Sequence, residues 1–119
     1  MKDFRQLNVW QKAHHLALGI YKLTQGFPRE ELYGLTSQMR RAGVSIAANI
    51  AEGCAQRTDA AFCRYLSIAL GSGAELEYHL LLAHDLGFVN DSDYESLQFE
   101  LAEVKKMLNG FIQKLSAKS

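Results

Sequence analysis

The chain has 119 residues, 48% of them hydrophobic, and its thirteen basic and thirteen acidic residues give a formal net charge of zero. This length predicts one domain, residues 1–119, that buries about two thirds of its surface on folding without metal ions or disulfides. The single proline, Pro28, and the lack of alternating β-branched runs argue against a sheet protein. Neutral charge weakens, without excluding, a prediction of nucleic-acid binding.

The ends and the cysteines of the chain predict a soluble, cytoplasmic protein. The first residues are charged, and the longest apolar runs are far shorter than the roughly 20 residues of a membrane span. Cys54 and Cys63 are nine residues apart, which fits neither a zinc nor a redox motif. We therefore expect two reduced thiols.

The first predicted helix runs from Asn8, as its N-cap, to about Gln25 and is ended by Gly26 and Pro28. Its apolar residues recur at steps of three and four: Val9, Ala13, Leu16, Ile20, Leu23 and Phe27. Residues 27–32 are predicted to form a connector with one helical turn, with Pro28 at its first position.

The second predicted helix begins near Gly34 or Leu35 and runs to about Glu52, with Gly53 as its terminator. Its apolar positions are less regular: Leu35, Met39, Ala42, Ile46 and Ile50. Asn49 lies among them, and a buried amide in such a seam usually fixes register or oligomeric state. We therefore predict a structural role for Asn49.

The third predicted helix begins after Thr58, its N-cap, and ends near Leu86, before Gly87. Its apolar positions are Phe62, Leu66, Ala69, Gly73, Leu76, Leu80 and Ala83. Gly71 and Gly73 each cost about 1 kcal/mol relative to alanine inside a helix. We predict that these glycines allow close packing against small residues of the second helix: Ala42, Gly43, Ser45, Ala47 and Ala48.

The fourth predicted helix follows a polar turn at residues 90–92 and fills the rest of the chain. Its apolar positions are Tyr94, Leu97, Leu101, Val104, Leu108, Phe111 and Leu115. A repeat averaging 3.5 residues is shorter than the helical period and favours left-handed supercoiling. The short connections at 52–58 and 87–92 require antiparallel neighbours. The predicted fold is therefore an all-α, antiparallel, up-down-up-down, left-handed four-helix bundle.

Enzyme motifs are absent from the sequence. Di-iron bundles need Glu-x-x-His pairs, and no acidic residue stands three positions before any of the four histidines. Glu75 and His79 could share a metal ion, but they flank the apolar seam and fit a solvated or interface pair better. No metallopeptidase helix, P-loop or nucleophile elbow is found. We predict no catalytic activity, no cofactor and no metal ion.

Four arginines gather around the second helix and the start of the third: Arg40, Arg41, Arg57 and Arg64. They could form one basic stripe that binds RNA or DNA. The alternative is a solvated face, in which these side chains pair with acids such as Glu52 and Asp59.

Several runs of residues resemble one known family. They are residues 4–11, Phe27-Pro28, Tyr33-Gly34-Leu35, Arg40-Arg41-Ala42, Asn49-Ile50-Ala51-Glu52-Gly53, Gly71-Ser72, Glu75-Leu76-Glu77 and Leu86-Gly87. The chain is similar, over nearly its whole length, to the bacterial four-helix bundle proteins encoded within intervening sequences of 23S rRNA genes. That family is related to the accessory variability determinants of diversity-generating retroelements.

The resemblance implies a ring-like homopentamer without known enzymatic activity. In the retroelement branch it implies a strongly basic ring that binds reverse transcriptase and nucleic acid, and the neutral charge of this chain departs from that branch.

Five large residues off the main seams also predict a second buried surface: Trp10, Leu32, Tyr33, Phe88 and Phe99. Two hypotheses stay open, a homo-oligomeric scaffold with an unknown partner and a nucleic-acid-binding accessory factor. For this chain we expect weak or no nucleic-acid binding at physiological salt.

Overall fold

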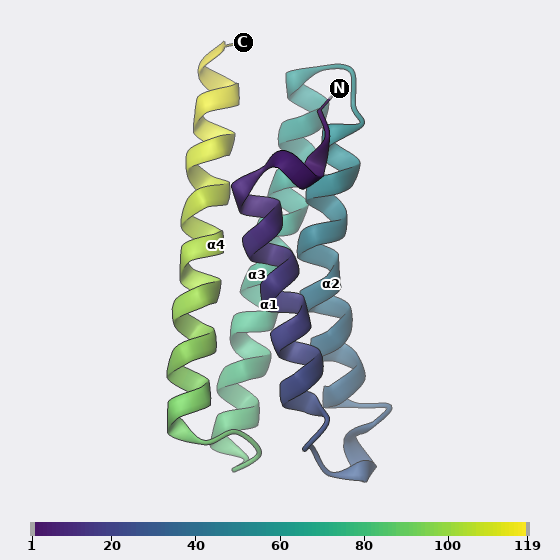
Figure 1. Cartoon of the computed structure of the whole chain (residues 1–119), viewed down its shortest axis with the longest axis vertical. Coiled ribbons are helices and arrows are strands. Elements are labelled where there is room, and N and C mark those ends of the chain that lie inside the picture. Colours follow the sequence, from purple (N-terminus) through teal and green to yellow (C-terminus); the bar gives the residue numbers. More distant parts are fainter. Residues whose placement is uncertain (1, 119) are drawn as a thin grey trace.

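Four long helices run alternately up and down in the computed structural model, which describes residues 2–118 (Figure 1). The elements are η1 (Phe4–Gln6), α1 (Asn8–Thr24), η2 (Arg29–Glu31), α2 (Leu35–Cys54), α3 (Asp59–Asp85) and α4 (Asp91–Lys118). Each helix packs beside the next along the chain, and α4 closes the bundle against α1. The all-α, up-down-up-down prediction is confirmed. None of the helices within residues 2–118 is both long and apolar enough to cross a membrane.

Most helix ends follow the capping residues predicted from the sequence. The Thr58 hydroxyl accepts a hydrogen bond from the Ala61 N–H at 3.1 Å, and Gly87 adopts φ +83° directly after the C-cap of α3. The start of α1 differs from the prediction. Leu7 is the N-cap and Asn8 is already helical, because the one-turn helix η1 leads directly into α1 and is itself capped by Asp3.

The connector between α1 and α2 contains the predicted single helical turn, η2. Pro28 stands directly before this turn, as its N-cap, and not at its first helical position. The adjacent Phe27 side chain is buried and packs against Phe88, with ring centroids 5.6 Å apart.

Gly53 does not terminate α2, contrary to the prediction. It is buried inside the helix, which continues to Cys54. A Cβ atom at this position would lie 2.7 Å from Cδ1 of Phe62 and 3.1 Å from Cβ of Tyr65. Gly53 is therefore a packing residue that allows α2 and α3 to approach closely.

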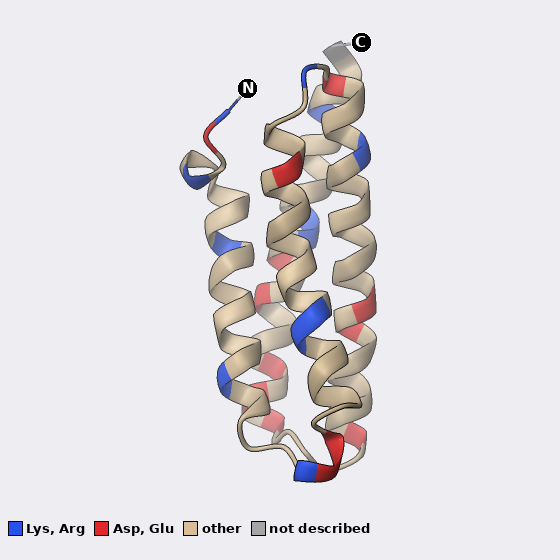
Figure 2. Cartoon of the chain, turned by 90° about the vertical axis from the view of Figure 1, so that its right-hand side faces the viewer, with Lys and Arg blue, Asp and Glu red and all other residues tan. Residues whose placement is uncertain are grey.

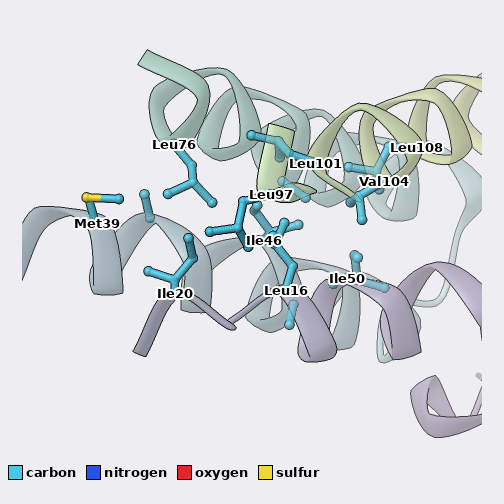
Figure 3. Packing of buried hydrophobic residues seen from close by; sticks show 14 of the residues in the cluster. Leu16, Ile20, Met39, Ile46, Ile50, Leu76, Leu97, Leu101, Val104 and Leu108 are labelled. Atoms are coloured by element: carbon cyan, nitrogen blue, oxygen red, sulfur yellow. The ribbon is translucent and has the colours of Figure 1, made fainter. Parts of the chain in front are cut away.

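The predicted seams form the core of the bundle (Figure 3). Every predicted seam residue of α3 is buried, and so is every predicted seam residue of α2. Leu76 and Leu101 are 0% and 1% exposed. Leu23, Tyr94 and Phe111 are half-buried and pack on the edge of the core.

The residues Gly71, Ser72 and Gly73 point in three different directions, because neighbouring helical positions are about 100° apart. Ser72 alone faces α2, where its hydroxyl lies 2.8 Å from the Ser45 hydroxyl. Gly73 faces α4, and a Cβ there would lie 3.3 Å from Cγ of Lys105. Gly71 is exposed, and no atom would lie within 4 Å of its Cβ. The prediction that both glycines pack against α2 is therefore wrong.

Candidate interaction surfaces

Large apolar side chains remain exposed on two surfaces of the bundle. We define the α1/α2 surface by Leu18, Tyr21, Leu32, Tyr33 and Val44. We define the α3/α4 surface by Tyr78, Leu81 and Phe99. Tyr33 is 93% exposed and Phe99 is 66% exposed. Contiguous apolar surface of this kind usually marks a site of interaction.

The two surfaces lie on opposite sides of the molecule. Helix α1 packs beside α2 and α4, and α3 also packs beside α2 and α4, so the four helices occupy the corners of a square. The edge formed by α1 and α2 is therefore opposite the edge formed by α3 and α4 (Figure 1). One face of a partner could not cover both surfaces.

Two adjoining grooves run along the α1/α2 surface and share Tyr21 and Val44. The groove toward the N-terminus of α1 is almost wholly apolar and is lined partly by alanines of α2. At its border, the ring of Trp10 stacks on His14 at 4.9 Å and meets Phe4 edge-on at 4.8 Å. These ring contacts pack η1 and the start of α1 together at the border of the groove.

Arg40 lines the second groove and is anchored to α1. Its Nε donates a hydrogen bond to the Thr24 hydroxyl at 2.9 Å, and its guanidinium lies 4.7 Å above the centre of the Tyr21 ring. The Thr24 hydroxyl in turn donates to the Ile20 carbonyl at 2.8 Å. Arg40 therefore places a positive charge in the groove in a defined orientation.

A groove on the α3/α4 surface is lined by Phe99, Tyr78 and Leu81 together with the acids Glu77 and Glu95. Glu77 pairs with Lys105 at 2.5 Å, and its carbonyl accepts a hydrogen bond from the Gln98 side chain at 3.1 Å. These two contacts link α3 to α4 beside the groove.

Of the five residues predicted to form a second buried surface, Leu32, Tyr33 and Phe99 are exposed in the single chain and belong to the two surfaces. Trp10 and Phe88 are instead half-buried against the core of their own chain, so these two predictions are wrong. Sequence reasoning missed five members: Leu18, Tyr21, Val44, Tyr78 and Leu81. Leu18 and Tyr21 are three residues apart and off the main seam, and so are Tyr78 and Leu81. This spacing places each pair on one face of its helix and could have identified them from the sequence.

The four arginines do not form one stripe. Arg41 pairs with Glu75 of α3 and with Gln38, and Arg40 is anchored as described. Arg57 lies in the α2–α3 connection and Arg64 near the start of α3, both exposed. Arg41 and Cys54 are thirteen positions apart in α2, which separates the two pairs by about 20 Å along the bundle. Figure 2 shows blue and red segments interspersed over the face in view.

Between α2 and α3 lies a small polar network. Asn49 donates from Nδ2 to the Ser45 carbonyl at 2.8 Å and to the Ser45 hydroxyl at 3.0 Å, and that hydroxyl contacts Ser72. Asn49 is half-buried at the edge of the seam and not within it. The network satisfies the amide locally and ties α2 to α3.

His79 is the most perturbed histidine of the described residues. Its side chain is 12% exposed, its Nδ1 is buried without a hydrogen-bond partner, and its Nε2 lies 3.5 Å from Glu75. Burial lowers the pKa of His79 below its ordinary value, and the nearby Arg41 acts in the same direction, whereas Glu75 opposes it. His79 is therefore a neutral, partly buried side chain at neutral pH.

Groups of three or more His, Cys, Asp or Glu side chains that could hold a metal ion do not occur within residues 2–118. Cys54 and Cys63 are free thiols. Burial raises the pKa of the Cys54 thiol, which makes it less reactive.

Comparison with known proteins identifies relatives of the whole bundle. Residues 5–110 match the model of the family described as 23S rRNA-intervening sequence protein. The chain is also similar to the crystal structure of a protein of unknown function, from the S23 ribosomal protein family, of Bacteroides thetaiotaomicron. The TM-score is 0.82 at 31% sequence identity, over 88% of this chain and 95% of that chain. No curated protein matches.

Proposed function

The chain belongs to the 23S rRNA-intervening sequence protein family, and from this premise we propose that it is a non-catalytic scaffold that acts as a homo-oligomer, a ring of five copies. The observation that carries the proposal is the pair of exposed apolar surfaces on opposite sides of the bundle. Soluble monomers rarely leave such surfaces uncovered. The number five comes from the family resemblance.

The non-catalytic part of the proposal is supported by the lack of enzyme motifs in the sequence. The cytoplasmic location that we propose is supported by the two free thiols, since an oxidising compartment favours disulfides. In this proposal the ring presents several copies of one surface to a partner, so that weak single contacts add up.

Light scattering coupled to size-exclusion chromatography tests the scaffold proposal. At micromolar concentration we expect a particle with five times the 13.3 kDa mass of the chain. Another closed multiple would keep the scaffold and correct the number of copies. A mass of 13.3 kDa would refute the proposal, because the two surfaces would then be exposed in the native protein.

The second candidate is a nucleic-acid-binding accessory factor, with RNA, DNA or a nucleic-acid enzyme as its partner. Arg57 and Arg64 support it, because both are exposed at the same end of the bundle and neither has an ion-pair partner among residues 2–118. Repetition of this pair around a ring would raise the local positive charge.

Fluorescence anisotropy with a labelled single-stranded RNA separates the two candidates. The scaffold proposal expects weak or no binding at physiological salt. The accessory-factor proposal expects submicromolar binding that falls steeply with salt, since each neutralised phosphate releases counterions. Arg57→Ala with Arg64→Ala should then weaken binding more than Arg40→Ala with Arg41→Ala, because Arg40 and Arg41 already have partners in their own chain.

A further inference from the structure

The two apolar surfaces have complementary charges. The residues that line the grooves of the α1/α2 surface include Arg40 and Arg41 and no acid. The residues that line the groove around Phe99 on the α3/α4 surface include Glu77 and Glu95 and no base, and Lys105 and Lys106 line a separate groove further along α4. Surfaces that bind each other commonly show this arrangement, because opposite potentials guide association and fix the register.

One charge in each groove lacks an ionic partner in its own chain. Arg41 is paired with Glu75, and Glu77 is paired with Lys105. Within residues 2–118, neither Arg40 nor Glu95 has an oppositely charged group within 4.0 Å. These two charges are free to pair with another molecule.

The complementary residues also lie at the same height along the bundle. Helices α2 and α4 are parallel and start at the same end (Figure 1). Arg40 is five residues after the first residue of α2, and Glu95 is four residues after the first residue of α4, which places them about 7.5 and 6 Å from those starts. Val44 and Phe99 are each four residues further on. Both helices therefore carry the charge and the apolar residue on successive turns, in the same order.

The grooves have opposite charges, Arg40 and Glu95 lack ionic partners, and these two residues lie at matching positions along the bundle. On these three grounds we propose that the α3/α4 surface of one copy binds the α1/α2 surface of a second copy. In this contact Phe99 packs beside Val44 and Tyr21, and Glu95 pairs with Arg40. The inference rests on the proposed homo-oligomer and adds which surfaces meet. It also specifies that neighbouring copies are parallel.

This contact joins two different surfaces, so it is heterologous, and each copy keeps one surface free for the next neighbour. Because the matching residues lie at similar distances from helix starts at the same end of the bundle, successive copies are related with little shift along the bundle axis. Such a contact closes into a ring if each copy is also rotated by a whole fraction of a full turn relative to its neighbour, whereas a shift along the axis would produce a filament.

Two single substitutions on the exposed surfaces test the pairing. Val44→Asp places a carboxylate on the α1/α2 surface, and Phe99→Asp places one on the α3/α4 surface. Both side chains are largely exposed, at 44% and 66%, so the fold of each chain should persist and circular dichroism checks it. We expect each variant alone to have the 13.3 kDa mass of one chain. An equimolar mixture should give a dimer of twice that mass, because each variant retains the surface that the other lacks.

The outcomes separate this inference from the proposed function. A wild-type monomer would refute both. If wild type is oligomeric but both variants keep its mass, the scaffold stands and the pairing is wrong. If Phe99→Asp alone still forms a dimer, the α1/α2 surface binds itself and the heterologous contact is wrong. A mixture that stays monomeric would equally contradict it.

Disulfide formation gives a second readout that does not depend on affinity. The double variant Val44→Cys, Phe99→Cys should form covalent multimers under mild oxidation, seen on a denaturing gel. Each single variant should form none, because the contact would join position 44 to position 99 and not to itself. Matched oxidation of wild type controls for Cys54 and Cys63. Cross-linking of Val44→Cys alone, or none in the double variant, would overturn the proposal.

Discussion

Gly53 lies where α2 passes closest to Phe62 and Tyr65 of α3. In Gly53→Ala the new methyl would meet the Phe62 ring at 2.7 Å, and Phe62 is buried and cannot withdraw without disturbing the core. We expect the free energy of unfolding to fall by about 1–3 kcal/mol, as for other overpacked sites. Urea unfolding at one fixed protein concentration measures it.

Gly71→Ala is the matched control, since it adds the same methyl in mid-helix where no atom lies within 4 Å. Helix propensity should raise its stability by up to about 1 kcal/mol. Equal changes in the free energy of unfolding for the two substitutions would contradict the close packing of Gly53 against Phe62.

The buried imidazole of His79 predicts how stability depends on pH. Burial lowers the pKa of His79 in the folded chain, whereas in the unfolded chain it titrates near its ordinary value of about 6.5. As pH falls below that value, the unfolded state takes up the proton first, so the free energy of unfolding decreases. Above it, neither state is protonated and His79 contributes no pH dependence.

Unfolding at pH 7.5 and pH 5.5 checks this expectation. His79→Gln, which cannot be protonated, should lose less stability between the two pH values than wild type. His15→Gln serves as the control, because His15 is exposed and pairs with Glu100 at 3.0 Å. An identical loss in wild type and His79→Gln would show that another group causes the pH dependence.

Among the helices, the seams carry most of the stability. Leu76 of α3 and Leu101 of α4 are almost fully buried, so Leu→Ala at either position should cost about 2–5 kcal/mol by lost burial and a residual cavity. Leu86→Ala, at an exposed position beyond α3, should change stability by about 0.5 kcal/mol or less. Thermal or urea unfolding compares the three. A small effect at Leu76 would contradict the seam assignment.

The helices and their seams could be predicted because each depends on local sequence. Spacing of apolar residues sets the buried face, and Thr58 and Gly87 mark helix ends by their own backbone and side-chain chemistry. The roles of Gly53 and Gly71 could not be predicted in this way. Whether a glycine ends a helix, admits a neighbouring ring or faces solvent depends on the neighbouring helix, which the local pattern does not specify.

For the whole molecule, the candidate site was only partly predictable. Phe99 and Tyr33 stand off the seams and could be recognised, but Tyr21 and Val44 become members of one surface only once α1 and α2 are side by side. The four arginines are close in sequence, yet the length of α2 separates them into two pairs, and Arg40 is anchored by Thr24 and Tyr21. Proximity in sequence did not predict proximity in space.

The central claim is that the two apolar surfaces are covered by further copies of this chain. Hydroxyl-radical footprinting of the wild type at micromolar concentration, read by mass spectrometry, tests it most directly. The account predicts that Tyr33, Tyr78 and Phe99 are oxidised much more slowly than in the monomeric variant Val44→Asp, although they are 93%, 59% and 66% exposed in the single chain. Leu86, which belongs to neither surface, should react equally in both. Equal oxidation of Tyr33 and Phe99 in wild type and this variant would contradict the account.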